Sequence, residues 1–587
     1  MSLRPVRIGN ASGFYGDRLG AMRALVDGGG IDVITGDYLA ELTMLILWKA
    51  RQRDPGTGYA RTFLTQFADV AGDCADQGIK IVVNAGGLNP AGMAEQVRRI
   101  AAAADADLRV AYVAGDDLMP ELNEMRDAGI AFEHLDTGTA LADADYEPVS
   151  ANAYLGGWGI AAALRGGADV VITGRVTDAA LVVGVGAWWH RWERTEYDEL
   201  AGAVAAGHII ECGPQATGGN YANLAEITDR RYPGSPIAEL AADGSFVVTK
   251  QPGTGGLVSV GTVTAQLLYE VGSPAYVNPD VVAHFDTMSV SQDGPDRVLV
   301  AGTRGTPPPP TLKVAMNAIG GYRNTMTMVL TGLDIEDKAA WAVDELFELL
   351  GGKDTFDTVD VQLLRYDRPD PTCLTEATAH LRITVKDRDR AKVDRAFSNA
   401  VVELAVAGYP GFHTTTPPTS ASEFGRYWPT LVPATAVDHV VVHHDGRGER
   451  IPHGPHAPAD PTPAIPASET ATPDFGPTTR RPLGTVVAAR SGDKGGNANV
   501  GVWTDSPERW DWLRAHLSAD RLRALIPDAS ELPVLRYEFP NLRALNFVIV
   551  GYLGEGVASC TKTDPQAKGL GEYLRAVHTD VPDKLVK

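Results

Sequence analysis

Cysteine is scarce in this sequence, with only Cys74, Cys212, Cys373 and Cys560 among 587 residues. None belongs to a C-x-x-C pair, so the spacing argues against a zinc knuckle, an iron–sulfur cluster or a disulfide framework. The first ten residues also lack the patterns of a signal peptide and of a transit peptide. We therefore expect reduced thiols and a cytoplasmic location.

Long basic runs are absent as well. Lys and Arg number 52 against 74 Asp and Glu, which gives a formal net charge of −22. This balance argues against nucleic acid and anionic membrane surfaces as partners, and no apolar run is long enough to span a bilayer. A few cations and backbone N–H groups can still bind an anion within one pocket. The expected partner is a small-molecule ligand.

The composition, 44% hydrophobic and 21% charged, is that of a globular protein. The first 180 residues alternate short β-branched runs with amphipathic stretches, a pattern typical of parallel strands joined by crossover helices. Right-handed crossovers would order them into a doubly wound, largely parallel α/β sheet. The expected strands are Val6–Gly9, Ile31–Thr35, Ile79–Asn84, Arg109–Ala114 and Asp169–Thr173, and the expected helices are Asp17–Gly28, Tyr38–Arg51, Gly58–Asp76 and Ala91–Ala104.

The length favours several domains. We expect an α/β domain with the ligand site over residues 1–285, in which the glycine-rich stretches His208–Asn220 and Gly253–Gly256 form loops. Residues 286–444 show the element order of a ferredoxin-like α+β unit, with helices at Ile335–Leu350 and Arg390–Ala407. A Pro-rich linker over 445–482 and a separate small α+β domain over 483–587 complete the chain.

Polar and small residues follow all five expected strands of the first domain. In an open parallel sheet, the loops at the carboxyl ends of the strands form the ligand crevice. The same residue types also form turns and helix N-caps, so each one alone has a structural explanation. As a group they predict a ligand site. The residues singled out are Asn10, Ser12, Asp37, Glu41, Asn84, Gly86, Gly87, Asn89, Asp116, Asp117, Arg175, Thr177 and Asp178.

The acids of this group fit two kinds of chemistry. Asp37, Glu41, Asp116, Asp117 and Asp178 could supply oxygen ligands for Mg²⁺ or a carboxylate pair for general acid–base catalysis. The spacing does not distinguish these alternatives, and Asp37 is also placed to cap the helix that contains Glu41.

His208-Ile-Ile-Glu-Cys-Gly-Pro brings a histidine and Cys212 together, followed by Thr217-Gly218-Gly219-Asn220. If the first part is helical, His208 and Cys212 share a face at i,i+4, a geometry that could activate a thiolate. A buried structural cysteine is the alternative. Gly218, Gly219 and Asn220 are further candidates for substrate binding.

The densest motif is Arg490-Ser-Gly-Asp-Lys-Gly-Gly-Asn-Ala-Asn499 near the C-terminus. Its cations and glycines are suited to holding a phosphate or carboxylate on backbone N–H groups. The spacing is not that of a Walker loop, and a tight hairpin is the structural alternative. The binding candidates are Arg490, Ser491, Asp493, Lys494 and Asn497.

Several strings resemble those of the acyclic terpene utilisation (AtuA-like) family: Arg7-Ile-Gly-Asn-Ala-Ser-Gly-Phe-Tyr-Gly-Asp17, Gly36-Asp-Tyr-Leu-Ala-Glu-Leu-Thr43, Asn84-Ala-Gly-Gly-Leu-Asn-Pro90, Thr173-Gly-Arg-Val-Thr-Asp178 and Gly207-His-Ile-Ile-Glu-Cys-Gly213. Arg490-Ser-Gly-Asp-Lys-Gly495 and Asn541-Leu-Arg-Ala-Leu-Asn546 resemble the small domain that accompanies this family. The resemblance implies catabolism of acyclic terpenoids and branched acids as coenzyme A thioesters, beside acyl-CoA carboxylases.

Two functional hypotheses follow. The first is an enzyme that acts on a branched or isoprenoid acyl-CoA, or its acid, by hydration, dehydration, hydrolysis or C–C cleavage. Asp37, Glu41, Asp178 and Cys212 would be catalytic, Arg175 would hold a carboxylate or thioester oxygen, and Mg²⁺ is a candidate cofactor. The second is a noncatalytic partner or assembly subunit of acyl-CoA-metabolising enzymes such as an acyl-CoA carboxylase. We also expect a homo-oligomer.

Overall fold

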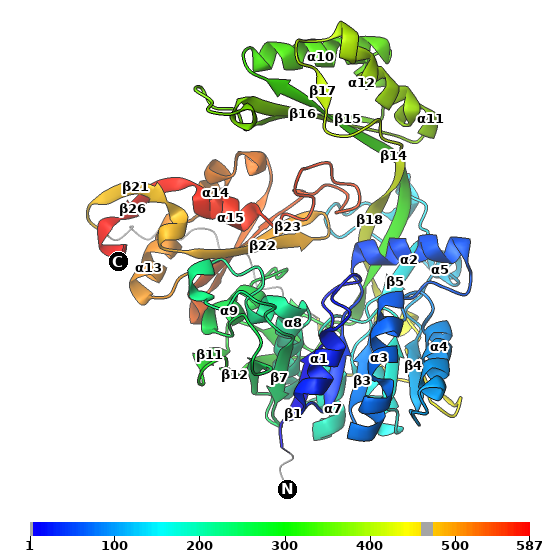
Figure 1. Cartoon of the computed structure of the whole chain (residues 1–587). Coiled ribbons are helices and arrows are strands. Elements are labelled where there is room, and N and C mark those ends of the chain that lie inside the picture. Colours follow the sequence, from blue (N-terminus) through cyan, green and yellow to red (C-terminus); the bar gives the residue numbers. More distant parts are fainter. Residues whose placement is uncertain (1–3, 459–473, 587) are drawn as a thin grey trace. The chain divides into compact units, whose positions relative to one another are not determined.

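The computed structural model describes residues 4–458 and 474–586. They form two compact units (Figure 1). The main unit comprises residues up to Asn317, Tyr427–Val557 and the chain from Gln566 on, and the inserted unit comprises Ala318–Arg426 and Ala558–Pro565. These limits differ from the expected boundaries at 285 and 444, because residues on both sides of the insertion belong to elements of the main unit.

The centre of the main sheet is the predicted parallel block. The five expected strands all form and pair in parallel in the order β1-β2-β3-β6-β4. Because β1 lies at one end of this block and not in its middle, the doubly wound order is not confirmed. The strands are β1 (Val6–Asn10), β2 (Val33–Gly36), β3 (Lys80–Val83), β6 (Val170–Thr173) and β4 (Val110–Ala114).

Antiparallel strands extend this sheet on both sides, so the expected largely parallel pairing holds only for its centre. Beyond β1 lie β7 (Pro236–Leu240), β8 (Phe246–Lys250), β12 (Val298–Ala301) and β11 (Ser289–Gln292); beyond β4 lie β19 (Val440–Val442) and β20 (Gly448–Arg450). β20 lies within the expected linker, of which residues 459–473 fall outside the described residues.

Helices cover the main sheet on two sides. α1 (Ala21–Gly28), α3 (Arg61–Gln77) and α4 (Pro90–Ala103) lie side by side on one face (Figure 1). Their apolar stripes pack against the strands around the fully buried Phe63 and Phe67. α6 (Trp158–Arg165), α7 (Ala180–His190) and α8 (Tyr197–Ile210) form a second helical layer.

The helix α8 is apolar all round, and every residue from Leu200 to Ile210 is buried. A small sheet of β9 (Ala275–Val277), β10 (Val282–His284) and β13 (Arg304–Thr306) packs against it. His208 is therefore helical, and the expected loop over His208–Asn220 is wrong for its first residues. Only the 3₁₀ turn Gly213–Thr217 and the residues after it are irregular.

The remaining helices and strands of the main unit's first part lie near the site described below. They are α2 (Glu41–Arg53), α5 (Leu122–Asp127), β5 (Ser150–Ala153), α9 (Val260–Leu267) and the first residues of β14 (Thr311–Thr331), which pair with β5.

The C-terminal region belongs to the main unit. Its antiparallel sheet has the order β22-β23-β25-β24. The elements are β22 (Ala488–Lys494), β23 (Asn497–Trp503), α13 (Pro507–His516), α14 (Ala519–Leu525), β24 (Val534–Phe539), β25 (Ala544–Ile549) and α15 (Leu570–Ala576), with β21 (Thr478–Pro482) paired to β26 (His578–Pro582).

This sheet packs closely on the segment after α9, so the expected separate domain is not a separate unit. The buried side chains of Asn499 and Asn546 donate to the carbonyl of Val271, at 3.2 and 2.7 Å. A Cβ on Gly501 would lie 2.5 Å from the Cβ of Leu268. The absence of a side chain at Gly501 therefore permits the contact.

The inserted unit has the expected element order. It contains the later part of β14, α10 (Ile335–Leu349), β15 (Thr358–Arg365), β16 (Thr378–Asp387), α11 (Arg390–Val393), α12 (Arg395–Ala407), β17 (His413–Thr414) and the start of β18 (Ser422–Pro433). The strand order β15-β16-β14-β17 is antiparallel throughout. The two sheets differ in connectivity. One edge of the sheet in the inserted unit is β17, its last strand in sequence, whereas the corresponding edge of the C-terminal sheet is β22, its first strand in sequence.

Candidate functional site

The first acid of the site, Asp37, is buried at the carboxyl end of β2. Asn84, which follows β3, donates from Nδ2 to Oδ1 of Asp37 at 2.6 Å and accepts from the N–H of Tyr38 at 2.7 Å. The carboxyl ends of neighbouring parallel strands thus bring Asp37 and Asn84 together, as predicted. Asn84 fixes the position of the acid.

Arg175, at the end of β6, is 3% exposed and already has partners. Its Nη1 lies 2.8 Å from Oδ1 of Asp178, its guanidinium lies 4.1 Å from the centre of the Tyr154 ring, and its backbone N–H donates to Asp116 at 2.8 Å. Because Arg175 is buried and paired, it orients the acids, and the expected role as a direct carboxylate clamp is not supported.

Glu41, the first residue of α2, forms the most accessible part of the site. Its Oε1 accepts from the hydroxyls of Tyr154 at 3.2 Å and Tyr427 at 3.4 Å, and lies 3.6 Å from Nζ of Lys313. The side chains of Glu41 and Lys313 retain 28% and 38% of their accessible surface. Both can therefore contact a ligand.

The protonation states of these two acids differ. Burial and the charge of Asp178 raise the pKa of Asp37 well above its ordinary value. Burial alone would raise the pKa of Glu41 too, but the charges of Lys313 and Arg175 outweigh it and lower this pKa to about 2. The Asp37 carboxyl is therefore protonated more readily than an exposed one, whereas Glu41 is ionised at neutral pH. Carboxyls with opposite shifts are the usual arrangement of a general acid and a general base.

A third acid, Glu211, follows α8. Burial and the charges of Asp178 and Glu270 raise its pKa well above the ordinary value. His208 Nδ1 lies 3.2 Å from Oε1 of Glu211, and burial lowers the pKa of His208 to about 4. A neutral His208 therefore lies beside Glu211, and the expected His208–Cys212 pair does not form among the described contacts. Burial and the charge of Glu211 also raise the pKa of Cys212, which disfavours a nucleophilic thiolate.

The C-terminal region contributes the last charged groups. Lys568 Nζ lies 3.8 Å from Glu270 and 3.6 Å from Asp493, and donates to the hydroxyl of Tyr269. Burial and the charge of Asp493 raise the pKa of Glu270 to about 7, although Lys568 opposes them. The charge of Glu41 also acts on Glu270 and Asp493, which places the two groups of acids in one electrostatic cluster. We call these residues together the acid–base site; its members are Asp37, Glu41, Asn84, Tyr154, Arg175, Asp178, His208, Glu211, Cys212, Tyr269, Glu270, Lys313, Tyr427, Asp493 and Lys568.

The motif Arg490–Asn499 is a hairpin and not an open anion-binding loop. Lys494 pairs with Asn497 across the turn Gly495–Gly496. Its Nζ donates to the carbonyl of Glu270 at 3.0 Å, and burial and the Lys313 charge lower its pKa to about 8. Arg490 lies 4.3 Å over the Tyr269 ring and donates to Gln215. The structural alternative therefore describes this motif better.

Several other predicted binding residues make hydrogen bonds to the protein backbone. Asn10 Nδ2 lies 2.7 Å from the carbonyl oxygen of Ile210 and 2.9 Å from those of Ser12 and Glu211. Ser12 donates to Phe14 at 3.0 Å. Asn10 thus ties the end of β1 to the segment that carries Glu211, and both side chains are engaged by the backbone.

The glycines and caps near β3 are structural as well. Asn89 is the N-cap of α4 and accepts from Gly92 at 2.9 Å. A Cβ on Gly86 would lie 2.5 Å from the carbonyl of Thr173, and one on Gly87 would lie 2.3 Å from the Leu47 side chain. These positions require glycine for close packing.

The remaining candidates also make hydrogen bonds or turns within the protein. Thr177 donates its backbone N–H to Leu155 at 2.9 Å, and Gly219 donates to Pro214 at 2.9 Å between Gly218 and Asn220, which both have positive φ. In the C-terminal region, Ser491 donates to Ala567 at 2.7 Å, and Asn497 donates to Asp136 at 2.9 Å.

The carboxylates do not form a metal site. Within residues 4–458 and 474–586, no group of three or more His, Cys, Asp or Glu side chains is placed to hold a metal ion. Asp116 accepts from Asn152 and Arg175, and Asp117 accepts from Met119, so these two acids face protein donors. The residues present do not fit Mg²⁺, and the chemistry considered below uses none. In the same part of the chain, no helix is long and apolar enough to cross a membrane.

Sequence reasoning missed Lys313, Glu270, Lys568 and the tyrosines of the site. Lys313 comes from a long strand, and Glu270 and Lys568 come from turns beside helices. No local pattern marks them, because the fold brings them together from distant parts of the chain. The sequence did mark one neighbour of these residues, the Arg490–Gly495 motif. Ser491 of this motif donates to the carbonyls of Ala567 and Lys568 and so positions the segment that carries Lys568.

Comparison with known proteins gives the family. No curated protein and no solved structure matches the chain. Residues 481–580 match the family described as the AtuA ferredoxin-like domain. Residues 6–443, about three quarters of the chain, match the family described as acyclic terpene utilisation family protein AtuA. The chain, which carries its acid–base site largely within that segment, therefore belongs to the acyclic terpene utilisation AtuA family.

Proposed function

We propose that this protein is a lyase that adds water to, or removes water from, an acyclic isoprenoid acyl compound by general acid–base catalysis. The observation that carries the proposal is the pair of Asp37 and Glu41, whose pKa values are shifted in opposite directions within one cluster. The family points to acyclic terpenoids as the substrate class.

Each step has a group to perform it. Ionised Glu41 would accept the proton from the carbon beside the carbonyl, and protonated Asp37 would deliver a proton to the leaving hydroxyl, which departs as water and leaves a C=C bond. Lys313, charged and 38% exposed, would stabilise the negative charge that develops on the carbonyl oxygen. The reverse sequence is hydration.

The protonated thiol of Cys212 supports this reaction class over hydrolysis through a covalent thioester, because a neutral buried thiol is a poor nucleophile. Whether the substrate carries coenzyme A or is the free acid is decided by experiment.

The test is turnover of branched β-hydroxy and α,β-unsaturated acids and their coenzyme A thioesters by the purified full chain, followed as the gain or loss of one water by mass spectrometry. Glu41→Gln and Asp37→Asn should each lower kcat by about a hundredfold or more. Glu95→Gln, which alters an exposed glutamate of α4, is the control and should keep the wild-type rate.

Absence of turnover by the wild-type protein on the whole panel would overturn the proposal. If the inactive protein also co-purified stoichiometrically with an acyl-CoA carboxylase, the noncatalytic alternative would take its place.

A further inference from the structure

A groove rich in tryptophan and arginine lies on the main unit, and no residue of the acid–base site lines it. Its volume is about 750 Å³, within the size range of ligand pockets. Two segments supply its characteristic side chains: α6, and the run Trp188-Trp-His-Arg-Trp-Glu-Arg194 at the end of α7. We call it the Trp–Arg groove; its main lining residues are Trp158, Arg165, Trp188, Arg191, Trp192 and Arg194.

The arginines of this groove have no carboxylate bonded to them. Arg165 donates to the carbonyls of Ala187 and Trp192, at 3.1 and 3.4 Å. Among the described residues, no carboxylate lies within ion-pair distance of Arg191 or Arg194, although the charge of Asp280 acts on Arg194. On a chain with a net charge of −22, three such guanidiniums in one place favour an anionic ligand.

The two glutamates that line the groove do not cancel this charge. Glu449 accepts from His443 at 2.8 Å and from Arg447 at 3.3 Å, so its charge is engaged elsewhere. Glu193 is the only other lining carboxylate that the structure records. The groove therefore keeps an excess of positive charge.

The aromatic rings complete the site. Trp158 and Trp192 are 8% and 3% exposed, and Arg194 lies 4.6 Å over the Trp158 ring, so that ring is already covered. Trp188 is more exposed than either, and its ring meets that of Trp189 edge to face with the ring centres 5.6 Å apart. An indole beside guanidiniums that carry no bonded carboxylate is suited to a ligand that joins an aromatic ring to phosphates.

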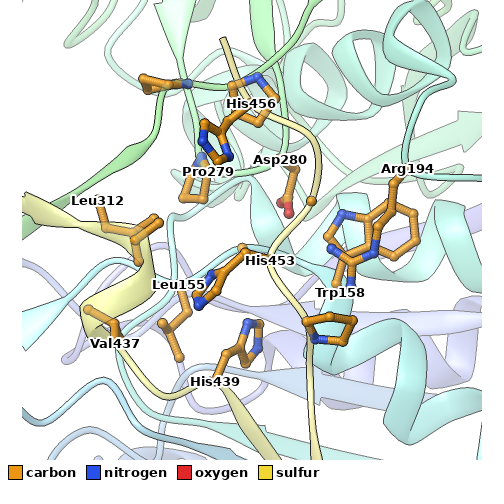
Figure 2. Close-up of a pocket in the computed structure, with 16 residues that line it drawn as sticks. Leu155, Trp158, Arg194, Pro279, Asp280, Leu312, Val437, His439, His453 and His456 are labelled. Atoms are coloured by element: carbon orange, nitrogen blue, oxygen red, sulfur yellow. The ribbon is translucent and has the colours of Figure 1, made fainter. Parts of the chain in front are cut away.

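A smaller cavity of about 50 Å³ adjoins the groove and shares Trp158 and Arg194 with it. Figure 2 shows Arg194 beside Trp158, with His453 and His456 on the neighbouring segment. Asp280, which also lines this cavity, accepts from the N–H of Gly157 at 2.7 Å, and its charge acts on Arg194. The imidazoles add possible hydrogen-bond donors at the phosphate end.

We propose that the Trp–Arg groove binds the nucleotide part of a ligand, with the base stacked on Trp188 and the phosphates held by Arg191 and Arg194. Planar guanidiniums match phosphate oxygens in geometry and charge. Free ADP and the nucleotide end of coenzyme A share this chemistry. Only the coenzyme A source rests on the proposed function, and binding of ADP is independent of it.

The experiment is calorimetric titration of the full chain with ADP, coenzyme A, adenosine and pyrophosphate at low salt. Arg191→Ala and Arg194→Ala should each weaken ADP about tenfold or more, because each removes a charged contact to phosphate. Trp188→Leu should weaken ADP about fivefold or more through lost stacking. Arg53→Ala, an exposed arginine at the end of α2, is the matched control and should leave ADP affinity unchanged.

The outcomes separate cleanly. Tighter binding of coenzyme A than of ADP assigns the groove to the coenzyme, and equal affinities assign it to the nucleotide part alone. The proposal is overturned if ADP does not bind, if neither arginine variant weakens it, or if pyrophosphate binds as tightly as ADP while Trp188→Leu has no effect. Thermal melting checks that the variants fold, and if Arg194→Ala does not, the exposed Arg191 decides. No arm uses turnover, so this result is independent of the acid–base site.

Discussion

Burial and the charge of Asp178 favour the neutral carboxyl of Asp37 in the folded protein more than water does in the unfolded chain. A carboxyl whose pKa is higher in the folded than in the unfolded state stabilises the fold only while it is protonated. That contribution is complete below the unfolded pKa of about 4 and is lost as pH rises toward the folded value. At neutral pH the raised pKa of Asp37 therefore lowers the free energy of unfolding of the wild-type protein.

Asp37→Asn tests this cost. The amide has the shape of the protonated acid and cannot ionise, so the variant should gain stability over the wild type as pH rises above about 4. Urea unfolding at pH 4, 6 and 8 measures the difference, which should widen with pH. A constant difference would show that Asp37 ionises normally in the folded protein.

Lys313 should control the pKa of Glu41. In Lys313→Met, Glu41 keeps Arg175, Tyr154 and a backbone hydrogen bond but loses the cation that lowers its pKa most, so this pKa should rise by about 1–3 units. The acid limb of the kcat/KM profile should move to higher pH by this amount. Lys353→Met, in the inserted unit, serves as the control and should leave the profile in place. An unmoved limb would mean that another group governs it.

Part of this chemistry could be predicted from sequence. Asp37, Asn84 and Arg175 follow consecutive parallel strands, so their proximity is a consequence of sheet geometry. Their roles could not be assigned, because a polar residue in a βα turn looks the same whether it binds a ligand or the backbone. Asn84 turned out to position Asp37, whereas Asn89 only caps a helix.

At the scale of elements, Asn10 joins β1 to the end of α8. Its side-chain amide is buried and serves the carbonyls of Ile210 and Glu211. Asn10→Ala should lower the free energy of unfolding by about 1–3 kcal/mol, because these buried carbonyls lose their donor. Chemical denaturation measures the change. The control Asn123→Ala, on the exposed surface of α5, should change the free energy of unfolding by no more than about 0.5 kcal/mol. An equally small effect of Asn10→Ala would show that the Asn10 hydrogen bonds do not stabilise the fold.

The regular elements were the most predictable feature. The five expected strands and the four expected helices of the first 180 residues form near their expected limits, since alternation of β-branched runs and amphipathic stretches is a local signal. The antiparallel strands β7, β8, β11 and β12 were not foreseen, because strand pairing beyond a parallel block depends on partners distant in sequence. The end of the apolar helix α8 was taken for part of a glycine-rich loop for a different reason, because burial on all sides removes the helical period.

At the scale of the whole molecule, the Pro-rich stretch suggested an independent C-terminal domain, whereas the structure places that region within the main unit. Removing residues 483–587 would uncover Leu268 and Tyr269 and leave the Val271 carbonyl without its donors. We expect the truncated protein to aggregate or to melt well below the full chain in calorimetry and size-exclusion chromatography. A monomeric remainder with the wild-type melting temperature would contradict the packing described here.

The scattering of the site along the sequence also has a consequence for biosynthesis. Asp37 and Lys568 are separated by about 530 residues, and Lys313 and Tyr427 lie on either side of the inserted unit. A ribosome must therefore release nearly all of these segments before the acids acquire their cations. Until then, Glu41, Glu270 and Asp493 lack Lys313 or Lys568 as neighbours, so the charge pattern of the acid–base site should form only in a nearly complete polypeptide.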